Sequence, residues 1–151
     1  MKKRYIVEIV LLIIALAIPF INGERKVSLK ELEEISTTCI DSTIMQQQEV
    51  KNIRKIYKIT EQEYDDYFSY GPISYMDVDE ITIFEQADKI KRQQLIDKLE
   101  IYVDTKIQTF KGYGIEQTKM LEEATIVEKG DFIICIISND KKSKEKIIQA
   151  F

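Results

Sequence analysis

The sequence predicts an α+β domain: a mainly antiparallel sheet of three to four strands packed against helices, preceded by an N-terminal hydrophobic segment. Three observations support this fold class. Apolar residues recur at helical spacing over 88–114, β-branched and aromatic residues gather within 77–86, and apolar residues fill both faces of 131–138. Because the order along the chain is helices, strands, one long helix, a hairpin and a last helix, we expect antiparallel strands with helices packed on them.

The first 23 residues have the pattern of a signal peptide or a membrane anchor, with basic residues at 2–4 before an apolar run at 9–21. The run is shorter than the roughly 20 residues that span a bilayer, which favours a signal peptide. Ile21 stands where a small residue is preferred for cleavage, which favours an anchor. Both alternatives place a single domain, 24–151, outside the cytoplasm.

The region after this segment begins with helical signals. Ser28 and Glu31 have the spacing of a capping box, so a helix is expected to start there. Whether one helix or two then reach Tyr57 stays open. Thr60 and Glu63 repeat the capping-box spacing and predict a short helical turn that continues to residue 67.

Two strands are expected next. Residues 67–70 predict a strand that ends at 71–72, where glycine and proline follow each other. Residues 77–86 predict a second strand, because Thr82, Ile83 and Phe84 are residue types enriched in strands.

The clearest element is a long helix within 88–114. Asp88 is expected to cap its first turn, and Gly112 and Gly114 are expected to end it. The apolar stripe that faces the core is Leu95, Leu99, Tyr102, Val103, Ile107 and Phe110. The residues expected to face water are Lys91, Arg92, Lys98, Asp104 and Lys111.

The C-terminal part predicts a short helix, a hairpin and a last helix. The helix is expected over 115–123, and the two strands over 124–128 and 131–138, joined by a tight turn at 129–130. Because the second strand is apolar on both faces, we expect it to be the central and most buried strand. Residue 139 or 140 is expected to cap the last helix.

Composition removes several classes of chemistry. The chain holds no histidine and no tryptophan, so most metal, Ser/His and Cys/His sites are excluded, and we predict no metal and no cofactor. The net charge of −4 gives no basic surface for nucleic acid. Cys39 and Cys135 are either two buried apolar side chains or, outside the cytoplasm, a disulfide, and both alternatives stay open.

Residues 50–151 also resemble a known family. The motifs that carry the resemblance are IYKI at 56–59, MDVDEI at 76–81, FKGY at 110–113 with Gln117 and Leu121, and GDF at 130–132 leading to SND at 138–140. They resemble the uncharacterised extracytoplasmic domains of Gram-positive, mostly clostridial bacteria known as domain of unknown function 4358. The resemblance implies a secreted or membrane-anchored α+β domain without an established activity, and it supplies no catalytic residues.

Tyrosines supply one group of candidate site residues, namely Tyr64, Tyr67, Tyr70, Tyr75 and Tyr113. If they are exposed together, their rings can stack on sugars or bind a partner protein. The alternative is that these rings pack at the rim of a small core with their hydroxyls in water.

Asp77 and Asp79 form the second candidate site. Alternation along a strand would place both carboxylates on one face, where they could bind Ca²⁺ or act as an acid and base pair. A calcium loop needs more oxygen ligands and usually a glycine, so the alternative is a solvated entrance to the strand expected over 77–86.

The preferred hypothesis is a non-enzymatic binding or accessory domain of the cell envelope. Its partner would be an envelope protein or a wall polymer, with membrane contact through residues 1–23 and no contact with nucleic acid. The alternative is a wall-acting hydrolase or esterase that uses Asp77 or Asp79, and a third is a purely regulatory or structural module. The absence of histidine and of a Gly-x-Ser-x-Gly motif favours binding over catalysis.

Overall fold

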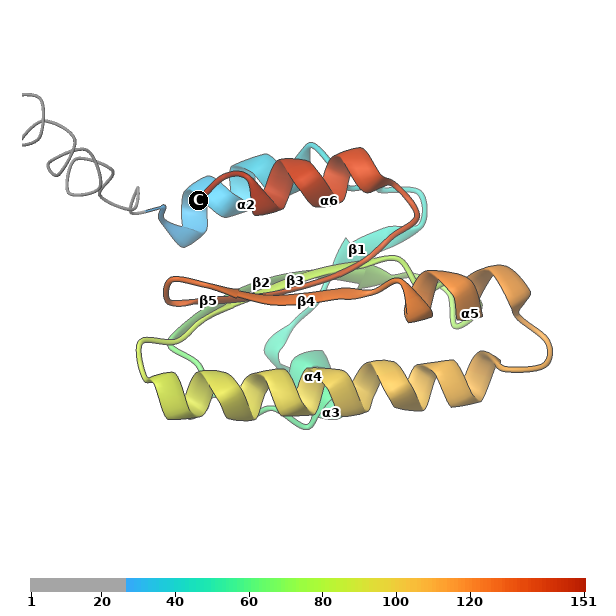
Figure 1. Cartoon of the computed structure of the whole chain (residues 1–151), viewed down its shortest axis with the longest axis horizontal. Coiled ribbons are helices and arrows are strands. Elements are labelled where there is room, and N and C mark those ends of the chain that lie inside the picture. Colours follow the sequence, from blue (N-terminus) through green and yellow to red (C-terminus); the bar gives the residue numbers. More distant parts are fainter. Residues whose placement is uncertain (1–26) are drawn as a thin grey trace, which may run out of the picture.

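A computed structural model describes residues 27–151, so the predicted signal peptide or anchor lies outside the described residues. A five-stranded sheet with the order β1-β2-β3-β5-β4 forms the middle layer, and every neighbouring pair is antiparallel. Helices α2 and α6 cover one face, α3 and α4 cover the other, and α5 lies at one end (Figure 1). Over the same residues no helix has the length and apolar character needed to cross a membrane.

The elements have the following bounds. The strands are β1 (Met45–Gln47), β2 (Asp66–Pro72), β3 (Glu80–Glu85), β4 (Thr125–Lys129) and β5 (Phe132–Ile137). The helices are α2 (Leu29–Thr37), α3 (Val50–Tyr57), α4 (Lys89–Phe110), α5 (Ile115–Glu122) and α6 (Lys141–Ile148). The predicted α+β class is confirmed, with one strand more than the three to four expected.

Side-chain caps begin three helices where the sequence predicts them. The Ser28 hydroxyl accepts from the backbone N–H of Glu31 at 3.3 Å, and the Asp88 carboxylate accepts from Ile90 at 2.8 Å and Lys91 at 3.0 Å. Asp140 caps α6 in the same way. Each cap satisfies backbone donors that a helix leaves unpaired at its start.

The alternating side chains of β3 and β5 divide the core into two clusters. Phe84, Ile133 and Cys135 lie on the α4 face, whereas Ile83 and Ile134 lie on the face covered by α2 and α6. All of β5 is buried, as predicted, because it has a strand on each side and helices on both faces. The strand in the middle of the five is β3, however, so the central position predicted for β5 is wrong.

Arg92 does not face water as predicted, because the start of α4 packs on the β4–β5 hairpin. Its guanidinium donates to the carbonyl oxygens of Gln86 and Ala87, both at 2.8 Å, and pairs with Glu128 at 2.8 Å and Asp131 at 3.1 Å. A buried charge is tolerated when it is paired and hydrogen-bonded in this manner. The contact fixes α4 on the sheet.

Between residues 38 and 72 the structure decides one open alternative and differs from two predictions. Two helices rather than one fill the region before Tyr57, because the short edge strand β1 lies between them. Residues 60–63 form a turn in which Glu63 accepts from the backbone and hydroxyl of Thr60, both at 2.8 Å, and no helix follows. Strand β2 continues to Pro72, which pairs with Met45.

The two cysteines lie on opposite sides of the sheet. Cys135 is buried in the cluster on the α4 face, and Cys39 packs against the other cluster. Both thiols are free, so the disulfide alternative is wrong.

Candidate functional site

Exposed apolar side chains gather on two loops at one end of the sheet. The loop between β2 and β3 presents Tyr75, which is 96% exposed, and the loop between α4 and α5 leads to Ile115, which is 85% exposed. We use the name loop surface for the exposed side chains of Ile73, Tyr75, Met76, Tyr113 and Ile115. Figure 1 places these loops beside α5, at the end opposite the start of α2.

A hydrogen bond joins the first loop to α5, the helix that directly follows the second loop. The Gln117 side chain donates to the carbonyl oxygen of Met76 at 3.2 Å. Within the second loop, the Tyr113 ring packs on Phe110 with 5.5 Å between centroids. A Cβ atom at Gly114 would come within 2.7 Å of the Phe110 ring, so only glycine fits beneath this pair. The loop surface is therefore held in a defined arrangement.

The structure separates the five candidate tyrosines. Tyr64 is buried against Phe84 with ring centroids 5.3 Å apart, and the Tyr67 hydroxyl donates to the Gln48 carbonyl at 3.1 Å. Tyr70 packs with the α2 and α6 cluster on the opposite face. The packing alternative thus describes these three rings, while Tyr75 and Tyr113 are exposed and lie on the loop surface.

Asp77 and Asp79 precede β3 instead of lying within it, so strand alternation does not place them on one face. Asp79 lines a cavity of about 250 Å³ together with Asp41 and Asp140, and Asp77 does not line it. Burial, with smaller contributions from Asp77 and Asp41, raises the pKa of Asp79. In residues 27–151 no group of acidic or thiol side chains has an arrangement that could hold a metal ion.

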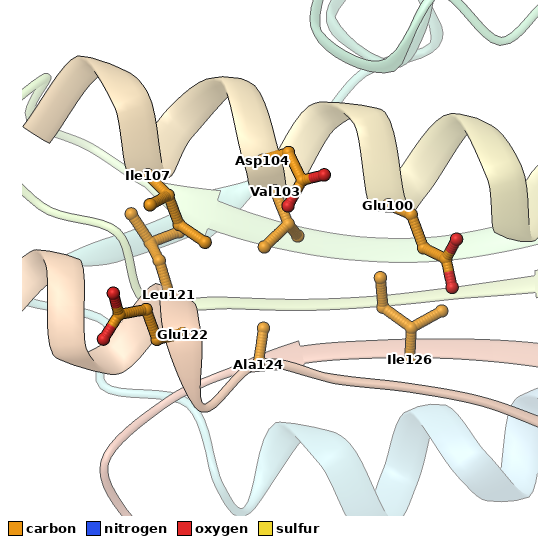
Figure 2. Close-up of a pocket in the computed structure, with 8 residues that line it drawn as sticks. All are labelled: Glu100, Val103, Asp104, Ile107, Leu121, Glu122, Ala124 and Ile126. Atoms are coloured by element: carbon orange, nitrogen blue, oxygen red, sulfur yellow. The ribbon is translucent and has the colours of Figure 1, made fainter. Parts of the chain in front are cut away.

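A groove of about 370 Å³ runs between α4 on one side and the end of α5, Ala124 and β4 on the other. Figure 2 shows Val103 and Ile107 of α4 on one side, and Leu121, Ala124 and Ile126 on the other. Three carboxylates border these apolar side chains, from Glu100, Asp104 and Glu122. The groove combines an apolar floor with an acidic rim.

A buried polar cluster that the sequence analysis missed lies between the sheet and helices α3 and α4. Glu80, the first residue of β3, accepts from the Tyr102 hydroxyl at 2.6 Å. The Thr82 hydroxyl lies 3.0 Å from that of Tyr57 and 2.7 Å from that of Ser69. The signal available in the sequence is alternation, because Glu80 and Thr82 share the inward face of β3 with Phe84.

Burial controls the ionisation of this cluster. Desolvation raises the pKa of Glu80 more than the hydrogen bonds from Tyr102 and Tyr57 lower it. Desolvation and the nearby Glu80 carboxyl also raise the pKa of both tyrosines. Within the described residues Glu80 forms no ion pair, and the cluster lines neither the cavity beside Asp79 nor the groove beside α4. We therefore assign the cluster to the core rather than to a reaction site.

Comparison with known proteins identifies a family. The family described as Domain of unknown function (DUF4358) matches residues 38–138, which include all five strands of the sheet and most of the helices. No curated protein and no solved structure matches the chain.

Proposed function

The chain belongs to the DUF4358 family, and from that premise we propose that it is a non-enzymatic binding or accessory domain of the cell envelope. Its partner is an envelope protein or a wall polymer, which it contacts through the loop surface. The observation that carries this proposal is the exposure of Tyr75 and Met76 on one loop and of Tyr113 and Ile115 at the start of α5. A hydrogen bond from Gln117 of α5 to Met76 holds the two parts together.

Exposed apolar side chains of this kind favour an interaction site. Single exposed apolar residues are common on any protein surface, but a group of them usually marks a binding surface. Tyrosine and methionine are enriched in interfaces, and a tyrosine ring can stack on a sugar or pack against a protein. Tyr75 and Tyr113 therefore suit either class of partner.

The position of the loop surface supports an envelope role. The pattern of residues 1–23 favours a signal peptide or an anchor and hence an extracytoplasmic domain. The loops lie at the end of the domain opposite the start of α2, the first described helix (Figure 1). If the N-terminal segment is retained in the membrane, this arrangement leaves the loop surface free for a partner.

A wall-acting hydrolase or esterase is the second candidate, and the raised pKa of Asp79 in a cavity is the observation that favours it. Asp77 lies outside the lining of that cavity, so the two carboxylates do not converge on one substrate position there. General acid and base catalysis needs both groups within reach of the reacting bond. For this reason we place binding first.

Site-specific crosslinking in the native membrane tests the proposal. A photoreactive phenylalanine analogue replaces Tyr75 or Tyr113 in the full chain, and in a matched control it replaces Ile101, an exposed apolar residue of α4. We expect a discrete adduct, with an envelope protein or with isolated wall material, from positions 75 and 113 and none from 101. Equal yields of adduct from all three positions would contradict the proposal that the partner binds at the loop surface.

Alanine variants then separate binding from folding. Tyr75→Ala and Tyr113→Ala should change the free energy of unfolding by within about 0.5 kcal/mol, as is usual at exposed sites. Recovery of the crosslinked partner should fall about tenfold or more, as at a binding hot spot. Loss of binding in proportion to a lower melting temperature would mean that these rings support the fold instead.

A further inference from the structure

The acidic side chains at the rim of the groove between α4 and β4 have no basic side chain as a partner within the described residues. Glu100, Asp104 and Glu122 are exposed, and within the described residues their carboxylates form neither an ion pair nor a hydrogen bond. No lysine or arginine lines the groove. Farther along β4, in contrast, Glu128 pairs with Arg92 at 2.8 Å. The acidic rim therefore offers charge complementarity to a cationic ligand.

Strand β4 provides a second binding feature beside the groove. It is an edge strand that pairs only with β5, so the backbone N–H and C=O groups on its outer side have no strand partner within residues 27–151. Proteins commonly protect such edges with charged side chains. Here the charged residues are at the end of the strand, Glu128 and Lys129, whereas residues 125–127 are uncharged.

The face of β4 that borders the groove is fixed by its register with β5. Ile126 pairs with Cys135, whose side chain lies on the α4 face, and Ile126 itself packs against that cluster. In a strand added beside β4, alternate side chains would point to the same face. They would meet Ile126, Val103 and Ile107, which Figure 2 shows lining the groove.

We propose that the β4 edge and the groove together bind an extended peptide segment of another protein. The segment has apolar side chains at alternate positions and basic side chains at its ends. Its backbone pairs with β4, its apolar side chains enter the groove, and its basic residues contact Glu100, Asp104 and Glu122. Backbone pairing supplies affinity, whereas the groove and its rim select the sequence.

A second copy of this chain is a less suitable occupant. If the β4 strands of two copies paired antiparallel about a two-fold axis, both α4 helices would lie on the same face of the joined sheet. The acidic rims of the two grooves would then approach each other, and like charges brought together are unfavourable. A basic segment meets no such repulsion.

The first experiment measures binding of a synthetic peptide to the full chain in nanodiscs of zwitterionic lipid, by fluorescence anisotropy at low salt. The probe has valine at alternate positions of its centre, threonine between them and two lysines at each end. A control probe carries glutamate in place of lysine. We expect saturable binding of the lysine probe only. Failure of the lysine probe to bind, or equal binding of both probes, would overturn the proposal.

Variants of the rim test the groove directly. The triple variant Glu100→Gln, Asp104→Asn and Glu122→Gln should weaken binding by about tenfold, since each exposed charge pair contributes modestly. A control triple variant, Glu34→Gln, Glu49→Gln and Glu145→Gln, removes the same charge elsewhere and should change the dissociation constant by less than about twofold. Equal weakening by the two triple variants would show non-specific attraction and overturn the groove as the site.

Backbone methylation of the probe tests strand addition. One form carries N-methyl groups at the valines and another at the threonines, so that each removes one set of alternate N–H donors. In a strand only one set faces β4, so one form should lose binding about tenfold or more and the other should bind within about twofold. Equal affinities of both forms would overturn strand addition. Sedimentation measures the oligomeric state of the chain with and without the probe. If the chain alone is a dimer, and the probe dissociates that dimer, the β4 edge binds a second copy and the proposal is overturned.

Discussion

The two faces of the sheet stabilise the same strand by different means. On the face covered by α2 and α6, β3 contributes Ile81 and Ile83 to an apolar cluster with β5 side chains such as Ile134. On the face covered by α3 and α4, the alternate residues Glu80 and Thr82 form a buried polar cluster beside the apolar one. We refer to these as the apolar face and the mixed face.

Burial on the mixed face, unlike burial on the apolar face, depends on completed hydrogen bonds. An apolar cluster gains stability as area leaves water, and it tolerates small changes in geometry. A buried carboxyl or hydroxyl costs free energy unless its partner is in place. Shifting β3 by one residue would exchange the two sets of side chains, so Glu80 would meet an apolar face without donors. The mixed face therefore specifies the register of β3.

Deleting a buried aliphatic side chain on each face should have the largest effect. Leu99 on α4 packs on the mixed face and Ile134 on β5 packs on the apolar face, and both are fully buried. We expect Leu99→Ala and Ile134→Ala each to lower the free energy of unfolding by about 2–5 kcal/mol. Denaturant unfolding of the purified chain measures both losses.

Ile101→Ala is the matched control, because Ile101 is on the same helix as Leu99 and is exposed. It should change the free energy of unfolding by within about 0.5 kcal/mol. A loss below about 1 kcal/mol for Leu99→Ala or Ile134→Ala would show that the corresponding cluster does not hold the sheet and helix together.

Removing one hydroxyl should affect the mixed face and leave the apolar face unchanged. Tyr102→Phe deletes the hydroxyl that donates to Glu80 at 2.6 Å, and we expect a loss of about 1–3 kcal/mol because a buried acceptor loses its donor. Tyr70→Phe is the control, since this half-buried ring packs on the apolar face and its hydroxyl makes no hydrogen bond to the described residues. Equal losses from both variants would remove the distinction between the faces.

The elements that sequence analysis predicts correctly are those whose signals are local. The caps at Ser28, Asp88 and Asp140 bond to backbone groups two or three residues away, so their spacing can be read directly. The stripe of α4 repeats over several turns, which makes its core side plain. In contrast, the sheet pairing of β1 and the burial of Arg92 depend on partners distant in the sequence.

The candidate sites follow the same rule. Tyr75 and Tyr113 appear among the tyrosines that the sequence suggests, but only the fold brings the β2–β3 loop beside α5 and places Tyr64 in the core. The groove joins α4 to residues well beyond it in the sequence, so no short motif reports it. The Glu80 cluster joins strands and helices through single hydroxyls. Alternation places Glu80 and Thr82 on one face of β3, but it does not report the helix hydroxyls that they meet.

The dependence of stability on pH has the smallest expected effect of these tests, and it is the most specific test of the mixed face. Burial raises the pKa of Glu80 above its ordinary value of about 4.5, so between the unfolded and folded pKa values the folded chain binds more protons than the unfolded chain. The contribution of Glu80 to stability is therefore fully present below about pH 4.5 and decreases as the pH rises through the folded pKa. The slope from this one group cannot exceed about 1.4 kcal/mol per pH unit.

Glu80→Gln isolates this contribution from other carboxyl groups whose pKa is shifted, among them Glu63, Asp79 and Glu85. Glutamine keeps an oxygen that accepts from Tyr102, and it does not ionise. In urea unfolding at a series of pH values, the two chains should differ least near about pH 4, and the variant should gain relative to the unsubstituted chain as the pH rises. Parallel curves would show that burial leaves the ionisation of Glu80 unchanged. A relative gain by the unsubstituted chain would show that hydrogen bonds from Tyr102 and Tyr57 outweigh desolvation, and the mixed face would then favour a buried anion.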